Sequence, residues 1–161
     1  NASEASNTST WNNTAPTNQV FSVNHDDTNA SGVTFIAYCW ADKNGFSKFG
    51  SYTGQENADG PFIYTGFKPA FIVFKKTTGS TQHWVNNDSV RSPFNVMDDR
   101  QYWSQATADA TNAAYNMDYY SNGFKVRSNS ISWNADGVKY VYWAWAENPI
   151  VGSNNVAATA R

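Results

Sequence analysis

The chain has 161 residues, enough for one domain or for one domain and part of another. Its 11 Lys and Arg against 13 Asp and Glu give a net charge of −2, which does not supply the basic stripe typical of nucleic-acid-binding proteins. The single cysteine, Cys39, excludes an intrachain disulfide framework, and no stretch approaches the ~20 apolar residues that span a bilayer, so we expect no membrane insertion.

The predicted elements are β-strands along the whole chain. In chain order, the candidates span residues 20–23, 33–41, 62–64, 70–75, 82–85, 123–127 and 138–146. Turn signals separate them, and in Asn122-Gly123 and Asp136-Gly137 the glycine allows the positive φ that tight hairpins need. Residues 106–114 form the only candidate for a short helix. The pattern predicts an all-β fold, an antiparallel β-sandwich of the jelly-roll or lectin-like kind.

An internal repeat organises the chain. Residues 29–42 return as residues 134–147 at an offset of 105 without a gap, with six of fourteen positions identical. Most other positions exchange similar residues, such as Phe35 for Tyr140 and Asp42 for Glu147. The repeat predicts two related units: residues 1–46 as the C-terminal half of a first unit, residues 47–151 as a complete second unit, and residues 152–161 as a tail.

The incomplete first unit bears on assembly. We expect its strands to complete a sheet either with residues upstream of the chain or with a neighbouring chain. The chain is therefore predicted to form homo-oligomers, and a trimer is expected by analogy with fibres alone.

The last predicted strand, within residues 138–146, is apolar on both faces. Strand alternation directs Tyr140 and Tyr142 to one side and Trp143 and Trp145 to the other. Such a strand lies either inside a sandwich or beneath another subunit. The sequence leaves both possibilities open.

Five blocks of sequence carry a resemblance to a known family. They are FGSYTG at 49–54, DGPFIYTGFKPAFIVFKK at 59–76, DSVRSPFNV at 88–96, YSNGFKVR at 120–127 and YWAWAENP at 142–149. The chain resembles a domain of unknown function that recurs in structural proteins of marine and other phages, over essentially its whole length. The resemblance implies a virion, tail or fibre protein, a member of a group often found beside lectin-like domains, and it implies no catalytic residues.

Composition makes a glycan a candidate ligand. Only 15% of the residues are charged, against roughly 25% in average proteins, while 16% are aromatic. Aromatic rings stack on sugar C–H surfaces, and amides and hydroxyls bond to sugar hydroxyls. The long stretch around residue 100, which contains no predicted strand, is the first place to look for a ligand site. The candidate ligand-binding residues are Arg100, Tyr102, Trp103, Tyr119 and Tyr120. Further aromatic candidates are Trp11 and Trp84. The alternative is that these aromatics fill the core or a subunit seam.

We expect no catalytic residues, no metal site and no cofactor. The densest acidic spots, Asp26-Asp27 and Asp98-Asp99, are adjacent residues, whereas glycoside hydrolysis needs carboxylates that face each other. The two histidines, His25 and His83, have no zinc-site spacing with the lone cysteine.

The predicted function is that of a phage virion protein, located on the particle surface: a tail-fibre or surface-fibre module for assembly with other virion proteins and for adhesion to host-surface glycans. The main alternative is a structural capsid-surface or tail module without a ligand. A polysaccharide depolymerase has less support.

Overall fold

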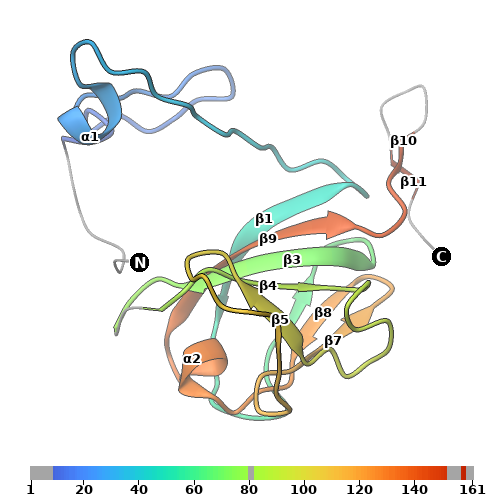
Figure 1. Cartoon of the computed structure of the whole chain (residues 1–161). Coiled ribbons are helices and arrows are strands. Elements are labelled where there is room, and N and C mark those ends of the chain that lie inside the picture. Colours follow the sequence, from blue (N-terminus) through green and yellow to red (C-terminus); the bar gives the residue numbers. More distant parts are fainter. Residues whose placement is uncertain (1–8, 80–81, 152–156, 159–161) are drawn as a thin grey trace. The chain divides into compact units, whose positions relative to one another are not determined.

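The computed structural model describes residues 9–79, 82–151 and 157–158. Contacts divide the chain into two compact units, Glu4–Trp40 and a larger unit formed chiefly by Ala41–Arg161. The boundary lies close to the one that the repeat predicts at residues 46 and 47. The regular structure of the described residues is mostly β-strands in antiparallel sheets (Figure 1), so the prediction of an all-β, sandwich-like fold is confirmed.

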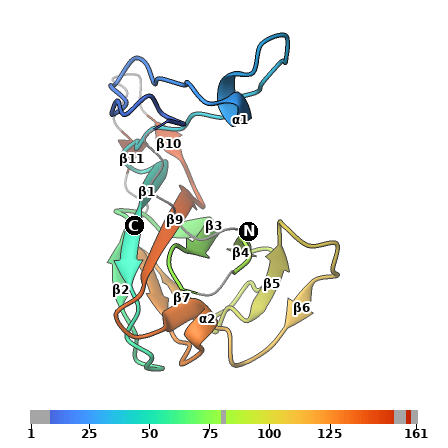
Figure 2. The same cartoon turned by 90° about the vertical axis from the view of Figure 1, so that its left-hand side faces the viewer.

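The larger unit contains a six-stranded sheet in the order β1-β9-β3-β4-β5-β6. Its strands are β1 (Ser47–Thr53), β3 (Pro69–Lys76), β4 (Val85–Asp88), β5 (Asp99–Tyr102), β6 (Ala110–Thr111) and β9 (Lys139–Ala146). A three-stranded sheet in the order β2-β8-β7 consists of β2 (Phe62–Tyr64), β7 (Met117–Tyr120) and β8 (Gly123–Val126). Figures 1 and 2 show the two sheets and the short helix α2 (Ile131–Asn134). A further pair joins β10 (Ile150–Val151) to β11 (Ala157–Ala158).

Strand β9 is an internal strand of the larger sheet, between the edge strand β1 and β3. It pairs along its whole length with β1, where Tyr140 faces Tyr52, and with β3, where Tyr142 faces Phe74. At Gly50 an added Cβ would lie 2.9 Å from the hydroxyl of Tyr142, so only glycine leaves room for that ring. The two-sided apolar pattern of this strand therefore reflects an internal position in a sheet.

The core lies on the inner face of the six-stranded sheet. The inner residues of β1, β3 and β9 pack there against the three-stranded sheet and α2, and the largest fully buried side chains include Trp133, Tyr140, Phe67, Phe74 and Phe124. Tyr52 and Tyr140 stack with ring centroids 4.8 Å apart, and Phe74 meets Trp133 edge-on at the same distance. Aromatic packing thus takes the place of disulfides in this unit.

Asn134 ties α2 to the loop after β1. Its side chain is completely buried, and its amide donates to the carbonyls of Asn57 and Ser128 at 2.9 and 2.8 Å. Its Oδ1 accepts from the N–H of Gln55 at 2.9 Å. All the hydrogen-bonding groups of a buried amide are thus occupied, apart from one lone pair.

The smaller unit contains the helix α1 (Asp26–Asn29) and a long extended segment. The predicted strands at 20–23 and 33–41 are wrong for the described residues, because neither segment pairs with another strand there. The backbone of residues 33–41 is nevertheless free of helix and turn. The sequence therefore predicts correctly that residues 33–41 are extended, but it does not predict that they lack a paired strand within the described residues.

The larger unit follows the predictions more closely. Strands predicted at 62–64, 70–75, 123–127 and 138–146 correspond to β2, β3, β8 and β9, while the strand expected at 82–85 begins only at Val85. The short helix considered at 106–114 is wrong, since Ala110–Thr111 forms β6. The sequence did not predict β1, β5 or β7.

We predict that Asn134→Asp lowers the free energy of unfolding by about 3 kcal/mol, because a carboxylate would replace an amide donor beside two carbonyl oxygens. Asn29→Asp, at the repeat-equivalent exposed position, is the matched control and should change it by less than about 0.5 kcal/mol. Urea unfolding followed by tryptophan fluorescence measures both. Equal effects of the two substitutions would contradict this role of Asn134.

We predict a loss of stability at high pH. Burial raises the pKa of Tyr52 and of Tyr119 well above the ordinary tyrosine value. The folded protein then keeps protons that the unfolded chain releases, so these groups leave the unfolding free energy constant below about pH 10 and lower it above. Urea unfolding between pH 8 and 11 tests this. Tyr52→Phe should weaken the pH dependence, whereas the same change at the exposed Tyr64 should not.

Candidate functional site

Six aromatic side chains lie on the outer face of the six-stranded sheet, opposite the core. Strand alternation places the members on β1, β3 and β9 there: while Ile72 and Phe74 of β3 face inward, Phe71 faces outward. The two members next to β4 and β5, Trp84 and Trp103, join them through ring contacts. We call this set the aromatic face, and it consists of Phe49, Phe71, Trp84, Trp103, Trp143 and Trp145.

The aromatic face is continuous. Ring centroids are 5.8 Å apart for Phe49 and Trp145 and 5.4 Å for Trp145 and Phe71. Trp103 lies 6.0 Å from Phe71 and 6.3 Å from Trp143, which in turn lies 4.8 Å from Trp84. These are the separations of mutually attractive aromatic pairs, so each ring fixes the orientation of the next.

Trp103 is the most exposed member, with half of its surface accessible to solvent. It follows β5 directly, and its N–H donates to the carbonyl of Trp84 at 3.0 Å. Its ring stacks on Phe71 with an angle of 29° between the planes. The backbone and the neighbouring ring thus hold an accessible indole in a defined orientation.

Polar groups border the aromatic face near Trp103. His83 Nδ1 lies 3.1 Å from the hydroxyl of Ser104, and His83 Nε2 lies 2.6 Å from Nε2 of Gln105. On another side, Arg91 bonds to Asp88, to Asp109 at 2.8 Å and to Gln101 at 3.1 Å. The charges around Arg91 are thus paired with each other, and hydroxyl, amide and imidazole groups lie beside Trp103. A further cation lies at the other tryptophan, since Lys75 Nζ is 5.7 Å from the ring centroid of Trp84.

Of the residues predicted as a ligand site, Arg100 and Tyr102 point away from this face. Arg100 is only 8% exposed. Its Nε donates to the hydroxyl of Tyr102 at 2.8 Å, and its guanidinium lies 4.4 Å from the ring centroid of Tyr115. Its Nη1 is buried without a hydrogen-bond partner in the described part of the chain. The expectation that Arg100 lies on an exposed ligand surface is therefore not met, because its cation packs between two aromatic rings.

Tyr119 and Tyr120, the other two predicted residues, lie on β7 in the second sheet. Tyr119 is buried, and its hydroxyl donates to the carbonyl of Asn87 at 3.0 Å. Tyr120 is partly exposed and meets Phe62 edge-on at 5.9 Å. Neither contacts Trp103, so the five predicted residues do not form one site.

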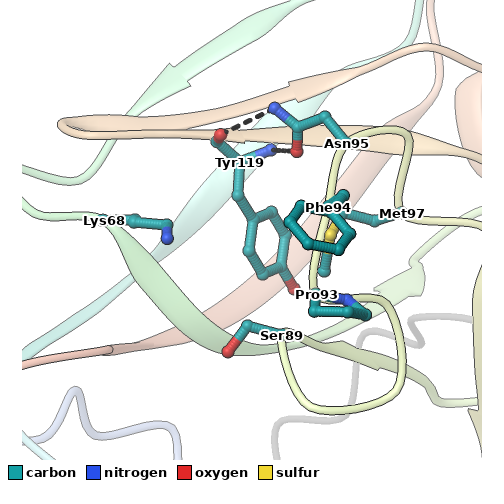
Figure 3. A pocket seen from close by; sticks show the side chains of 7 residues that line it. All are labelled: Lys68, Ser89, Pro93, Phe94, Asn95, Met97 and Tyr119. Atoms are coloured by element: carbon teal, nitrogen blue, oxygen red, sulfur yellow. Dashed lines mark hydrogen bonds between the residues drawn. The ribbon is translucent and has the colours of Figure 1, made fainter.

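A small pocket of about 200 Å³ opens beside Tyr119 (Figure 3). Asn95 closes it with two hydrogen bonds to the backbone of Tyr119, at 2.9 and 3.0 Å. Lys68 also lines it and forms an ion pair with Glu147 at 2.9 Å. The pocket is therefore smaller than an ordinary ligand cavity, and its one cation already has a counter-ion.

The described residues contain no group of three or more His, Cys, Asp or Glu side chains arranged to hold a metal ion. No helix within the described ranges is both long and apolar enough to cross a membrane.

Sequence reasoning found Trp84 and Trp103 but missed Phe49 and Phe71 as members of the aromatic face. For Phe71 a signal exists, since alternation along β3 separates it from Ile72 and Phe74. For Phe49 the pairing with Trp143 is needed, and it joins residues 94 positions apart in the chain (143 − 49). Local sequence therefore cannot assemble the whole face.

Comparison with known proteins gives one match. The family model described as "Domain of unknown function (DUF7483)" matches residues 1–149. Neither the curated proteins nor the solved structures contain a significant match to the chain.

We predict opposite effects of substitution at two adjacent asparagines of β4. Both are buried and each has an Oδ1 atom without a hydrogen-bond partner among the described residues. Asn86 faces outward beside the buried Val73, so Asn86→Val should raise the free energy of unfolding by about 1 kcal/mol by removing an unsatisfied acceptor. Asn87→Val should lower it, because the Asn87 amide donates to the carbonyl of Asp99 at 2.6 Å. Urea unfolding of both variants measures the signs, and destabilisation by Asn86→Val would contradict the prediction.

Proposed function

We propose a function from the premise that the chain belongs to the DUF7483 family, whose description leaves its role open. The chain is proposed to be a surface-fibre or tail-fibre module of a phage virion, which contributes to assembly and adheres to host-surface glycans through the aromatic face. The observation that carries the adhesion proposal is the half-exposed, oriented ring of Trp103 within a continuous set of aromatic side chains.

The chemistry of sugars fits this arrangement. The C–H surface of a pyranose ring stacks on an indole, and Trp103 presents such a ring beside Phe71. The hydroxyls of the sugar require donors and acceptors next to the stacking surface, and the exposed side chains of Ser104 and Gln105 supply both. The aromatic face and this border together provide the mixed lining that a sugar ligand requires.

The charges near Trp103 favour a neutral glycan. Arg91 is paired with Asp88 and Asp109, so neither sign dominates beside the ring. A strongly charged polymer would gain little at Trp103, because the nearby cation, Arg91, is already paired with two carboxylates. The same pairing gives less support to a degrading enzyme, since both carboxylates are held by one guanidinium.

Placement on a virion rests on the sequence resemblance to phage structural proteins and on the weakly charged, aromatic-rich composition. The all-β architecture is compatible with it but common to many functions. We propose a homo-oligomer, with a trimer as the first state to test.

A purely structural module is the second candidate, in which the aromatic face is buried between subunits. The size of the face favours it, because aromatic residues are enriched at the centres of protein interfaces. The two candidates differ in what Trp103 does in the assembled protein. In the adhesion proposal it contacts glycan, and in the structural one it contacts another subunit.

We predict that Trp103→Ala reduces glycan binding at least tenfold, because the variant loses the accessible stacking surface; tenfold corresponds to about 1.4 kcal/mol. The measurement uses immobilised bacterial surface polysaccharides and competition with phage adsorption. Trp11→Ala is the matched control, since Trp11 is 53% exposed and Trp103 is 50% exposed, in different units. It should bind as the unsubstituted chain does.

Sedimentation of the same variants separates the two candidates. A monodisperse monomer of the unsubstituted chain would contradict the predicted oligomer. Loss of oligomer in Trp103→Ala alone would identify a subunit seam in place of a glycan surface. Full polysaccharide binding by folded Trp103→Ala would exclude the aromatic face as the adhesive site.

A further inference from the structure

The two copies of the internal repeat have the same local structure. Helix α1 (Asp26–Asn29) and helix α2 (Ile131–Asn134) occupy positions related by the sequence offset of 105. The N-terminal cap of each is the equivalent residue: the His25 side chain accepts from the N–H of Asp27, and the Ser130 side chain accepts from the N–H of Ser132. The equivalence found in the sequence therefore extends to the backbone.

The turn after each helix is also conserved between the copies. The N–H of Val33 donates to the carbonyl of Ala30 at 3.3 Å, and the N–H of Val138 donates to that of Ala135 at 3.2 Å. Gly32 and Gly137 lie in these turns with φ of 75° and 68°. Each copy thus sends the chain through one helical turn and one tight turn into an extended segment.

The copies differ in what the extended segment does. Residues 139–146 form β9, paired on both sides and buried on the inner face. Residues 33–41 have no strand pairing within the described ranges, and Ile36 and Tyr38 are 77% and 74% exposed. A β-strand sequence with large exposed apolar side chains is a template for pairing with another strand.

We infer that residues 33–41 are the central strand of a second sheet. Their binding partner is a half-unit with the sequence pattern of residues 43–129, which supplies strands equivalent to β1 and β3 and precedes residue 25 in the same polypeptide. This inference rests on the repeat and is independent of the glycan site. It also assigns the mode of binding, insertion between two strands.

Two observations select this partner. A second copy of the described larger unit offers no vacancy, because β9 already lies between its β1 and β3. In that unit the order along the chain is β1 to β8, then α2, then β9. Since α1 and residues 33–41 correspond to α2 and β9, chain order places the matching half-unit before α1.

Side-chain positions are compatible with the insertion. Phe35 takes the place of the fully buried Tyr140, and Cys39 takes the place of the fully buried Ala144. Asn29, now exposed, takes the place of Asn134, whose amide is bound by the loop after β1. The inferred partner would therefore satisfy the same amide that the larger unit satisfies within itself.

We test the inference by replacing residues 1–24 of the full chain with a copy of residues 43–129. Cys39 serves as a native probe, because it is exposed in the present chain and is its only cysteine. In the extended protein we expect its reaction with a thiol reagent to slow at least tenfold and the amides of residues 33–41 to be protected from hydrogen exchange. Phe35→Asp, directed into the new core, should abolish both effects. Thr34→Asp, one residue away and directed outward, is the control and should leave them intact.

An extended protein with folded repeats but fast thiol reaction and unprotected amides would overturn the inference. A second variant covers the case in which the extension does not fold. In this second variant, a copy of residues 25–42 replaces residues 130–147 of the full chain. Its control carries the same eighteen residues at the same place in scrambled order. The inference predicts cooperative unfolding of the ordered version and none of the scrambled one, and equal behaviour of the two would overturn it.

Discussion

The larger unit depends on the double-sided pairing of β9. This strand hydrogen-bonds to β1 on one edge and to β3 on the other, and it supplies Tyr140 and Tyr142 to the core while Trp143 and Trp145 form part of the aromatic face. Both layers of side chains would lose their order if the strand shifted by one residue, since every side chain would then change faces. Because both faces are apolar, side-chain shape must fix the register, as where the Tyr142 ring lies over Gly50. The strand also connects the core to the proposed binding surface.

The sequence predicted the parts of this fold that local patterns describe. The long apolar runs of β3 and β9 and the Asn122-Gly123 turn between β7 and β8 are readable without tertiary information. Strand β1 is not predictable because Ser47–Thr53 contains Gly and Lys and only two large apolar side chains, and it is held in the sheet by its partner β9. The sequence predicts a strand at residues 82–85, whereas β4 begins only at Val85. Its residues Asn86, Asn87 and Asp88 disfavour strands, and they form one here because β3 and β5 pair with β4 from both sides.

As for the fold, only the locally visible part of the candidate site was predictable from the sequence. Trp103 was identified because an aromatic residue in a polar stretch is visible in the sequence. Arg100 was placed on the surface for a similar reason, but its guanidinium packs against Tyr102 and Tyr115, and only the fold brings Tyr115 there. The aromatic face combines residues of β1, β3 and β9 with residues beside β4 and β5, so it exists only after strands distant in the chain have paired.

The position of β9 late in its unit has a consequence for synthesis. Strands β1 and β3 leave the ribosome well before residues 139–146, and at roughly 5–20 residues per second they wait several seconds for the strand that belongs between them. During this interval each strand has an edge without its partner, and β3 also carries the apolar run Phe71–Phe74, a combination that promotes aggregation. Nascent chains on neighbouring ribosomes can then supply one another's missing strand. The yield of folded protein during expression should therefore fall as ribosomes become more closely spaced on the messenger RNA, even for a protein that is stable once its synthesis is complete.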